Sequence, residues 1–413
     1  MVMDRKEENM FQQIKEIQGF TVLNGYKVED GKFYFTGVKD GKWYFNTLDL
    51  EKNSTQENKN HVEAENYDIY TPLDDESAVY VDVKGQLFYR KGNQEIKIDE
   101  EIMGTHRPNL LVSPKQNGIL YTKGSKEKAD LYVYFFNDKR PILIKKAIPE
   151  EAFTTFSFTT QWSHTGNYFL YYNTEIYDNQ GELYTSIWAT TAQWSPDDKY
   201  ITYIVKPSNL QETKIQIGDW NTYIGTQMSL LFIGNKKDKI IYEDSMGLID
   251  PIDNIQWSKD STKVSITVGN ITKTSYNELE RVDYKKIFIY DVLEQDSKEI
   301  GNMPYNYHEI LFNNYIYASS LGKKDILKII SIDGEFNRKY ENPKLLNAKD
   351  MFVISHDNEA YFLDKSNLMT FTPQQEKVIL ELPWDVNEIY FDTKTRKFIF
   401  ITKDNYLYIA KYT

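Results

Sequence analysis

From about residue 21 to the C-terminus, apolar and polar residues alternate in short runs that are separated by Asp, Gly, Asn, Lys and Pro. Examples are KFYFTGV from Lys32, YITYIV from Tyr200 and KFIFIT from Lys397. Alternation over a few residues between turn-forming residues predicts β-strands. The 32 Tyr, 22 Phe and 7 Trp residues favour strands as well, because aromatic side chains fit a pleated, half-buried surface. The pattern therefore predicts an all-β fold.

The N-terminus shows a different period. Met10, Phe11, Ile14 and Ile17 recur at the spacing of one helical face. We therefore predict a short N-terminal helix within residues 1–19, as an extension or linker ahead of a β domain over residues 20–413. The helix has two interpretations: it docks its apolar face on the main body, or it attaches the domain to another protein.

An internal repeat organises the middle of the chain. QWSHTGNYFLYY begins at Gln161, QWSPDDKYITYIV at Gln193 and QWSKDSTKVSITV at Gln256. Each copy places Trp-Ser at the end of one strand, before a polar turn and an alternating strand. Pro and Asp suit the turn, and a Trp can fill the wedge between neighbouring sheets. We predict structural roles for the repeat residues Trp162, Ser163, Gly166, Trp194, Ser195, Pro196, Asp197, Trp257, Ser258 and Asp260.

These residues resemble the Trp-Ser-Pro-Asp-Gly-Lys motif of TolB-like β-propeller repeats, which are related to WD repeats. The resemblance is clearest from Trp194 to Asp197 and weaker in the other two copies. Asp198 stands where the family usually has Gly, at a turn position whose positive φ an Asp tolerates. The resemblance implies a β-propeller and, commonly, a bacterial envelope or accessory protein with an interaction role.

The number of modules bears on the size of the propeller. Counting every strand-turn-strand module gives nine, including degenerate ones such as the module from Pro108. Propellers usually have about four to eight blades of four antiparallel strands, so one module is expected to be an insertion or an incomplete blade. We predict a single closed β-propeller of eight blades, with seven as the second choice. The last module shows three strands, and a strand near Phe20–Leu23 is expected to complete it and close the ring.

Composition and charge limit the kinds of partner and site that the protein can have. The formal net charge of −12 disfavours broad electrostatic binding to nucleic acid or an anionic membrane. The absence of Cys excludes disulfides, thiolate metal sites and a Cys nucleophile. No apolar run approaches the roughly 20 residues of a transmembrane helix. The first residues do not form a signal peptide, so two locations stay open: cytoplasmic, or extracytoplasmic after removal of a leader.

The sequence carries no recognisable motif for catalysis, a metal or a cofactor. The five histidines lie in different modules without metal-ligand spacing. There is no G-x-S-x-G, and GVKDGKW from Gly37 lacks one residue and the Ser or Thr of a phosphate-binding loop. We therefore expect a non-enzymatic protein without a cofactor.

One segment is a candidate for a functional insertion. Residues from about Trp220 to Asp253 account for the longer interval between the second and third Trp-Ser copies. The alternative is an extra hairpin that extends one blade. The candidate partner-binding residues are Trp220, Tyr223, Leu230, Leu231 and Phe232.

Three functional hypotheses follow, and the oligomeric state stays open in each. The first is a binding scaffold for a protein or a cell-envelope component. The second is a carbohydrate-binding or glycoside-hydrolysing propeller that uses carboxylates at the axial channel. The third is a sensor domain detached from a membrane-anchored regulator. An exposed apolar patch on one face would favour the first, and converging carboxylates beside an aromatic ring would favour the second.

Overall fold

The described residues form an all-β protein, as the sequence predicts, with two short helices that the sequence analysis did not predict. They divide into two compact units, a terminal unit of Met1–Val83, Phe88–Lys97 and Asn342–Thr413 and a central unit of Lys84–Leu87 and Ile98–Glu341. Within several strands only the backbone is described. The computed structural model describes the chain except residues 1–10, 17–20, 30, 40–41, 53, 58–66, 74–76, 104–107, 139, 206–213, 218–219, 224–225, 245–246, 249–254, 274–278, 305–306, 313–314, 321–325, 332–336, 342–351, 355–359, 365–366, 373–374, 384, 393 and 413.

The described part of the terminal unit contains four antiparallel sheets of four strands each. Three of them are formed by strands that follow one another in sequence, and the fourth combines the two ends of the chain. In sheet order they are β2 (Thr21–Glu29), β3 (Lys32–Lys39), β4 (Lys42–Asp49) and β5 (Ser54–Glu57); β6 (Tyr67–Pro72), β7 (Ser77–Asp82), β8 (Leu87–Lys91) and β9 (Gln94–Asp99); β33 (Phe352–Ile354), β34 (Ala360–Asp364), β35 (Asn367–Thr372) and β36 (Gln375–Glu381); and β1 (Phe11–Glu16), β39 (Leu407–Tyr412), β38 (Lys397–Thr402) and β37 (Val386–Asp392).

The described part of the central unit contains five larger sheets and one small hairpin. The helices α1 (Glu150–Thr154) and α2 (Phe156–Thr159) link its first two sheets. The sheets are β10 (Leu110–Val112), β11 (Gly118–Ser125), β12 (Lys128–Phe135) and β13 (Pro141–Ile148); β14 (Gln161–Trp162), β15 (Tyr168–Tyr171), β16 (Glu175–Asp178) and β17 (Leu183–Ser186); β18 (Ala189–Trp194), β19 (Tyr200–Val205), β22 (Thr226–Phe232) and β23 (Lys237–Asp244); β24 (Gly247–Leu248), β25 (Ile255–Trp257), β26 (Lys263–Lys273), β27 (Leu279–Asp291) and β28 (Asp296–Pro304); β29 (Tyr307–Phe312), β30 (Tyr315–Ser320), β31 (Ile326–Ser331) and β32 (Asn337–Glu341); and the hairpin β20 (Lys214–Ile217) and β21 (Trp220–Tyr223).

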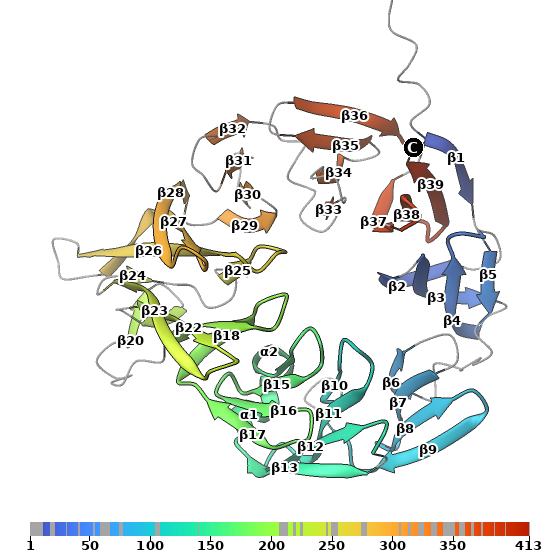
Figure 1. The fold of residues 1–413 in the computed structure, drawn as a ribbon. Coiled ribbons are helices and arrows are strands. Elements are labelled where there is room, and N and C mark those ends of the chain that lie inside the picture. Colours follow the sequence, from blue (N-terminus) through green and yellow to red (C-terminus); the bar gives the residue numbers. More distant parts are fainter. Residues whose placement is uncertain are drawn as a thin grey trace, which may run out of the picture. The chain divides into compact units, whose positions relative to one another are not determined.

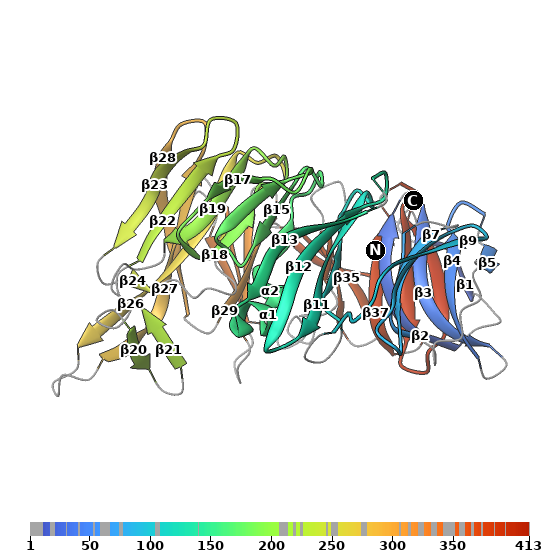
Figure 2. The ribbon, with the colours of Figure 1, turned by 90° about the horizontal axis from the view of Figure 1, so that it is seen from below.

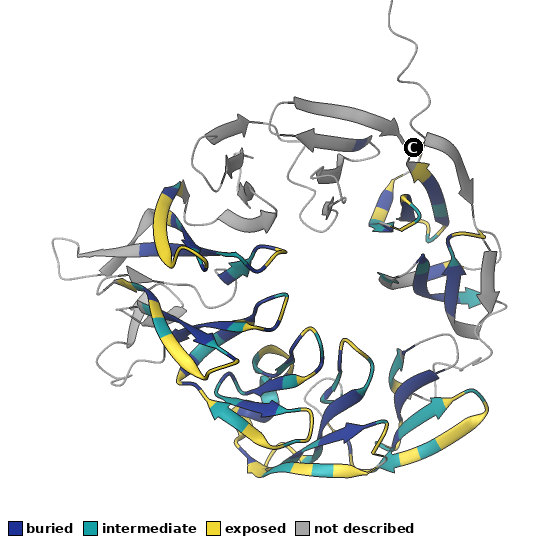
Figure 3. Ribbon diagram, in the orientation of Figure 1, coloured by how far each residue is buried: buried dark blue, intermediate teal, exposed yellow. Residues whose placement is uncertain are grey.

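The cores lie between neighbouring sheets. In the central unit one cluster joins β10–β13 to β14–β17, a second joins β14–β17 to the sheet of β18 and β19, and a third joins that sheet to the one built around β26. In the terminal unit, Phe33 of β3 and Ile399 of β38 belong to one such cluster. Outer strands such as β13 carry exposed residues, whereas β11 is largely buried (Figure 3). Four-stranded meanders packed face to face are the blades of a β-propeller, and each unit has this architecture.

The N-terminal segment is a strand, and the predicted helix is wrong. Phe11–Glu16 forms β1 and pairs antiparallel with β39, with Phe11 opposite Tyr412 and Lys15 opposite Ile409 (Figures 1 and 2). An N-terminal strand therefore completes the last sheet, as expected, but residues 11–16 supply it. Of the segment near Phe20–Leu23, Phe20 lies outside the described residues, and the rest forms the start of β2, which pairs with β3.

The nine modules counted in the sequence correspond to nine sheets of four or more strands among the described residues. The modules without a Trp form complete sheets too, so the described part of the chain contains no incomplete module. The number of blades that share one ring stays a prediction.

Candidate functional site

The first hairpin turns of consecutive sheets in the central unit share one geometry. Ser163, Ser195 and Ser258 are buried, and each donates its backbone N–H to the carbonyl oxygen five residues later at 2.9 Å. Each hydroxyl also accepts the N–H of that same later residue, at 2.9 to 3.2 Å. Ser113 lies in an equivalent turn without a Trp, where its backbone N–H bonds Gly118 and its hydroxyl accepts from Asn117. The repeat serines therefore hold their turns closed.

The acidic residues of these turns are bound locally. The hydroxyls of Ser195 and Ser258 donate to Asp197 at 2.8 Å and Asp260 at 2.6 Å. Asp197 also lies 2.9 Å from the ammonium group of Lys199. Burial opposes ionisation, but these hydrogen bonds lower the pKa of both carboxyls. Pro196, between Ser195 and Asp197 in the second copy's turn, is half-buried.

Each turn also contacts the turn of the preceding sheet, through its residue with positive φ. Gly166, Asp198 and Ser261 occupy this position with φ of 69°, 58° and 61°. A Cβ on Gly166 would lie 3.0 Å from the side-chain oxygen of Asn117. The Ser261 hydroxyl accepts the Asp197 backbone N–H at 3.0 Å. The residue that replaces the family glycine therefore connects neighbouring sheets.

Asp198 makes the most extensive of these contacts. One of its oxygens accepts the backbone N–H of His164 at 2.7 Å and lies 3.2 Å from His164 Nδ1. The other accepts the backbone N–H and the hydroxyl of Thr165, at 2.6 and 2.5 Å. Burial alone would raise the pKa of Asp198, but the hydrogen bonds from His164 and Thr165 lower it to about 2. The pKa of His164 is raised, chiefly by its hydrogen bond with Asp198.

The three repeat tryptophans lie at the junctions with the preceding sheets. Trp194 stacks on Tyr168 with ring centroids 6.0 Å apart, and Trp257 stacks on Tyr200 at 5.8 Å. Trp162 instead donates its indole N–H to the Leu111 carbonyl at 3.2 Å. All three belong to clusters that join two sheets. The three tryptophans therefore contribute to the packing of one sheet against the next.

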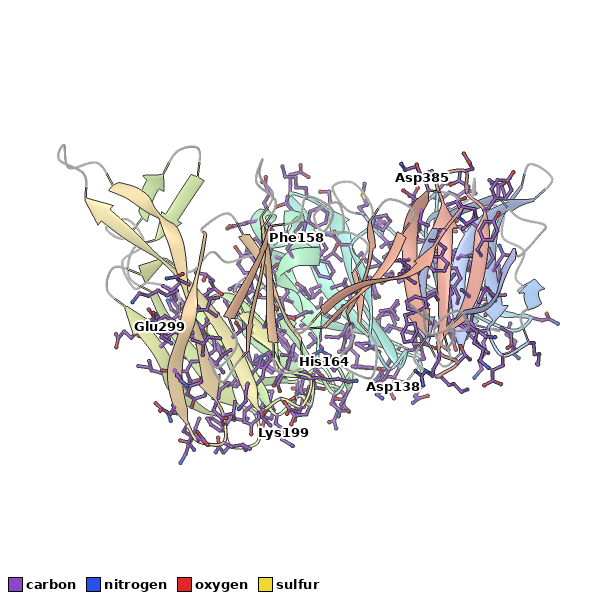
Figure 4. The ribbon with its side chains drawn as sticks, turned by 90° about the horizontal axis from the view of Figure 1, so that it is seen from above. Asp138, Phe158, His164, Lys199, Glu299 and Asp385 are labelled. Carbon is purple, nitrogen blue, oxygen red and sulfur yellow. The ribbon has the colours of Figure 1, made fainter. Side chains whose placement is uncertain are left out.

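A pocket of about 460 Å³ with a mixed polar and apolar lining lies at the end of the central unit that carries these first hairpin turns, which we call the hairpin end. Its lining includes Tyr168, Asp197, Asp198, Lys199 and Phe232. Figure 4 shows His164 and Lys199 at this end and Phe158 at the opposite end. The pKa values of both carboxyls in this lining are lowered, so both are ionised at neutral pH.

The predicted partner-binding insertion is only partly separate from the sheets. Leu230 and Leu231 are 0% and 1% exposed within β22, which pairs with β19, so their assignment to a binding surface is wrong. Phe232 is half-buried, with its ring centroid 5.3 Å from that of Tyr200. Trp220 and Tyr223 begin and end β21, and their side chains lie outside the described residues. In sequence, the hairpin β20–β21 is thus inserted between β19 and β22, the second and third strands of one sheet.

Three exposed apolar side chains lie at the other end, which we call the link end because the links between successive sheets lie there. Met103 is 51% exposed in the link before β10, Phe158 is 86% exposed in α2 before β14, and Trp188 is 57% exposed in the link before β18. The three sheets that these links lead into follow one another in sequence. The sequence did not single them out. Phe156 lies two residues from Phe158 and is only 1% exposed, so the residue type alone does not distinguish the exposed phenylalanine from the buried one.

Hydrogen bonds connect these three links. Asn109 donates its backbone N–H to the Met103 carbonyl at 3.2 Å and its side-chain amide to the Phe153 carbonyl at 2.9 Å. Asn173 donates its backbone N–H to the Thr159 carbonyl at 2.8 Å and its amide to the Thr190 carbonyl at 3.0 Å. The segments that carry the exposed apolar side chains are therefore held by shared backbone contacts.

In the part of the chain that is described, no group of three or more His, Asp or Glu residues is placed to hold a metal ion. None of the described helices is long and apolar enough to span a bilayer.

Comparison with known proteins supports no family assignment. No protein-family model and no curated protein matches the chain. Among solved structures, the chain is similar to the Dos1 propeller (8% identity, TM-score 0.49, 97% of this chain and 96% of that chain) and to TolB from Acinetobacter baumannii (13%, 0.30, 77% and 78%). It is also similar to the tricorn protease (13%, 0.40, 87% of this chain), of whose length it spans only 43%. At these identities and scores the likenesses add nothing about activity.

Proposed function

We propose that this protein is a non-enzymatic β-propeller scaffold that binds a protein partner at the link end of its central unit. The observation that supports this most directly is the exposure of Met103, Phe158 and Trp188 in the links that lead into three consecutive sheets. Exposed apolar groups gathered on one surface are typical of sites of protein interaction. Aromatic anchors on a rigid support lose little entropy on binding.

Affinity capture from the native organism, followed by crosslinking, tests the proposal. The bait is the full chain, compared with the double variant Phe158→Ser and Trp188→Ser. We expect one or more captured proteins to be lost with the double variant. Leu293→Ser is the matched control, because Leu293 is 75% exposed in the turn between β27 and β28. Capture that is the same for all three baits would overturn the proposal.

Sugar binding is a second candidate, favoured by the pocket at the hairpin end. Tyr168 and Phe232 supply aromatic rings there, and Asp197 and Lys199 supply polar groups. A sugar has apolar C–H faces and a rim of hydroxyls, which such a lining matches. Screening the protein on a glycan array, with Tyr168→Ala and Asp197→Ala as variants, tests this candidate. Failure of either variant to weaken a detected binding would exclude the pocket.

We further propose a TolB-like ring closed by the pairing of β1 with β39. Support comes from the recurring Trp-Ser turns and from the N-terminal strand in the last sheet. Eight blades, the number predicted from the sequence, would leave one of the nine described sheets outside the ring, whereas nine blades would use all of them. An experimental structure of the full chain decides the count.

A further inference from the structure

The charges around the exposed apolar residues indicate which kind of partner fits the link end. The described links and turns at this end of the first three sheets of the central unit carry one exposed lysine, Lys126, which pairs with Glu150 at 2.7 Å. Two more exposed lysines, Lys128 and Lys146, lie at the ends of β12 and β13 beside them. Five exposed glutamates in the links and turns outnumber these lysines: Glu100, Glu101, Glu127, Glu150 and Glu151. The end that carries the three exposed apolar residues therefore has an excess of acidic side chains.

The geometry of the sheets sets the spacing of the apolar points. Packed sheets lie about 10 Å apart, so one link follows the next at about that distance. An α-helix rises 1.5 Å per residue, and about seven residues of helix cover that interval. A helix that contacts all three links would then need apolar residues at about every seventh position, over about four turns. Positively charged residues beside them would face the glutamates.

We propose that the link end binds a basic amphipathic helix of a partner protein, with Phe158 as its central anchor. This inference rests on the proposed function, because it names the partner's chemistry at the same surface. Phe158 suits the central role because it lies on the link between those of Met103 and Trp188 and is 86% exposed. The acidic rim would attract the helix and orient it, and the apolar contacts would hold it.

The backbone of the links that carry the exposed apolar residues is held by hydrogen bonds before any partner binds. Such a fixed surface favours a partner segment of regular structure, such as a helix. Asn109 joins the first two links, and Asn173, which is 6% exposed, joins α2 to the start of β18. Phe153 and Phe156 anchor the two helices in the core beneath Phe158. A partner therefore meets anchors whose backbone is held before binding, and the ordering cost falls mainly on the partner.

Synthetic peptides of about 18 residues test the inference with the full chain. The probe has Leu at every seventh position with Lys and Arg between, and it is labelled for fluorescence anisotropy. One comparison peptide has the same composition in scrambled order, and another has Glu in place of Lys and Arg. We expect the probe to bind with a Kd that rises at least tenfold in Phe158→Ser and several-fold in Glu150→Gln with Glu151→Gln. Raising the salt from 50 to 300 mM should weaken binding to the wild type more than to the glutamine variant.

Matched variants separate this site from general attraction to an acidic protein. Leu293→Ser with Glu294→Gln changes one exposed apolar and one exposed acidic residue of the β27–β28 turn, and it should leave the Kd unchanged. Equal binding of the acidic peptide, or binding that is insensitive to Phe158→Ser, would overturn the inference. If native capture depends on Phe158 while the basic probe does not bind, the proposed function stands and the partner chemistry is wrong. If neither depends on Phe158, both are wrong.

Discussion

Asp198 offers the sharpest test of how neighbouring sheets are held together. Its carboxylate is 5% exposed and accepts hydrogen bonds from His164 and Thr165 of the preceding turn. Asp198→Asn keeps the shape of the side chain, but it removes the charge and turns an N–H group toward these donors. The fall of the pKa from 3.8 to about 2 corresponds to about 2.5 kcal/mol, at about 1.4 kcal/mol per unit. We expect Asp198→Asn to lose about that much stability at pH 7.

The magnitude translates into modest but measurable shifts. For 413 residues that unfold together, about 2.5 kcal/mol lowers Tm by roughly 3 °C, and by more if the units unfold separately. Asp198→Gly should cost less than Asp198→Asn, because Gly relieves the positive φ of 58° by about 1 kcal/mol and lets water reach the donors. Because the folded-state pKa is depressed, the contribution of Asp198 is present above pH 4 and is lost as the pH falls towards 2.

Urea unfolding and amide hydrogen exchange provide the assay. Exchange at the amides of His164 and Thr165 should accelerate in Asp198→Asn, because both donate to Asp198. Asp197→Asn is the control: Asn retains an acceptor for Ser195, and the pair with exposed Lys199 contributes little. If Asp198→Asn is as stable as the wild type to within about 0.5 kcal/mol, the hydrogen bonds do not hold the sheets together and the reasoning fails.

Three further predictions concern stability. His164→Ala should be more destabilising at pH 5.5 than at pH 8.5 in urea unfolding, because the raised pKa of His164 adds stability that is present below its usual pKa of about 6.5 and is lost as pH rises through the folded-state value; equal losses at both values would contradict this. Trp194→Ala should cost about 3 to 5 kcal/mol, because the indole is 2% exposed, whereas Trp188→Ala, at 57% exposure, should cost much less by the same measurement. Deleting residues 1–16 should cause aggregation seen by light scattering, because β39 loses its partner β1, whereas deleting residues 1–10 should not.

The Trp-Ser turns could be predicted from sequence because their chemistry is local. Each Ser bonds a residue five positions later, so one short segment contains both partners. The prediction that Asp198 tolerates positive φ is confirmed at 58°. What Asp198 binds could not be predicted, since its donors lie more than thirty positions earlier, on another sheet.

The errors have physical causes as well. The segment around Phe11 and Ile14 has too few residues to separate a helical period from a strand, and its partner β39 lies at the other end of the chain. Leu230 and Leu231 form part of a continuous apolar run, which is as typical of a buried strand as of an exposed loop. Phe158 escaped notice because exposure depends on which side of a short helix faces the core.

The two ends of the central unit have different roles: the hairpin end stabilises the contacts between sheets, and the link end presents an exposed surface. At the hairpin end, turn residues use their polar groups on one another and on the next sheet, as Asp198 does with His164. At the link end the backbone is equally bonded, through Asn109 and Asn173, but Phe158 stays exposed. Phe158→Ser should therefore change binding with little effect on the free energy of unfolding, and Asp198→Asn should do the reverse. A large loss of partner binding in a folded Asp198→Asn variant would show that the two ends are coupled and that this division is wrong.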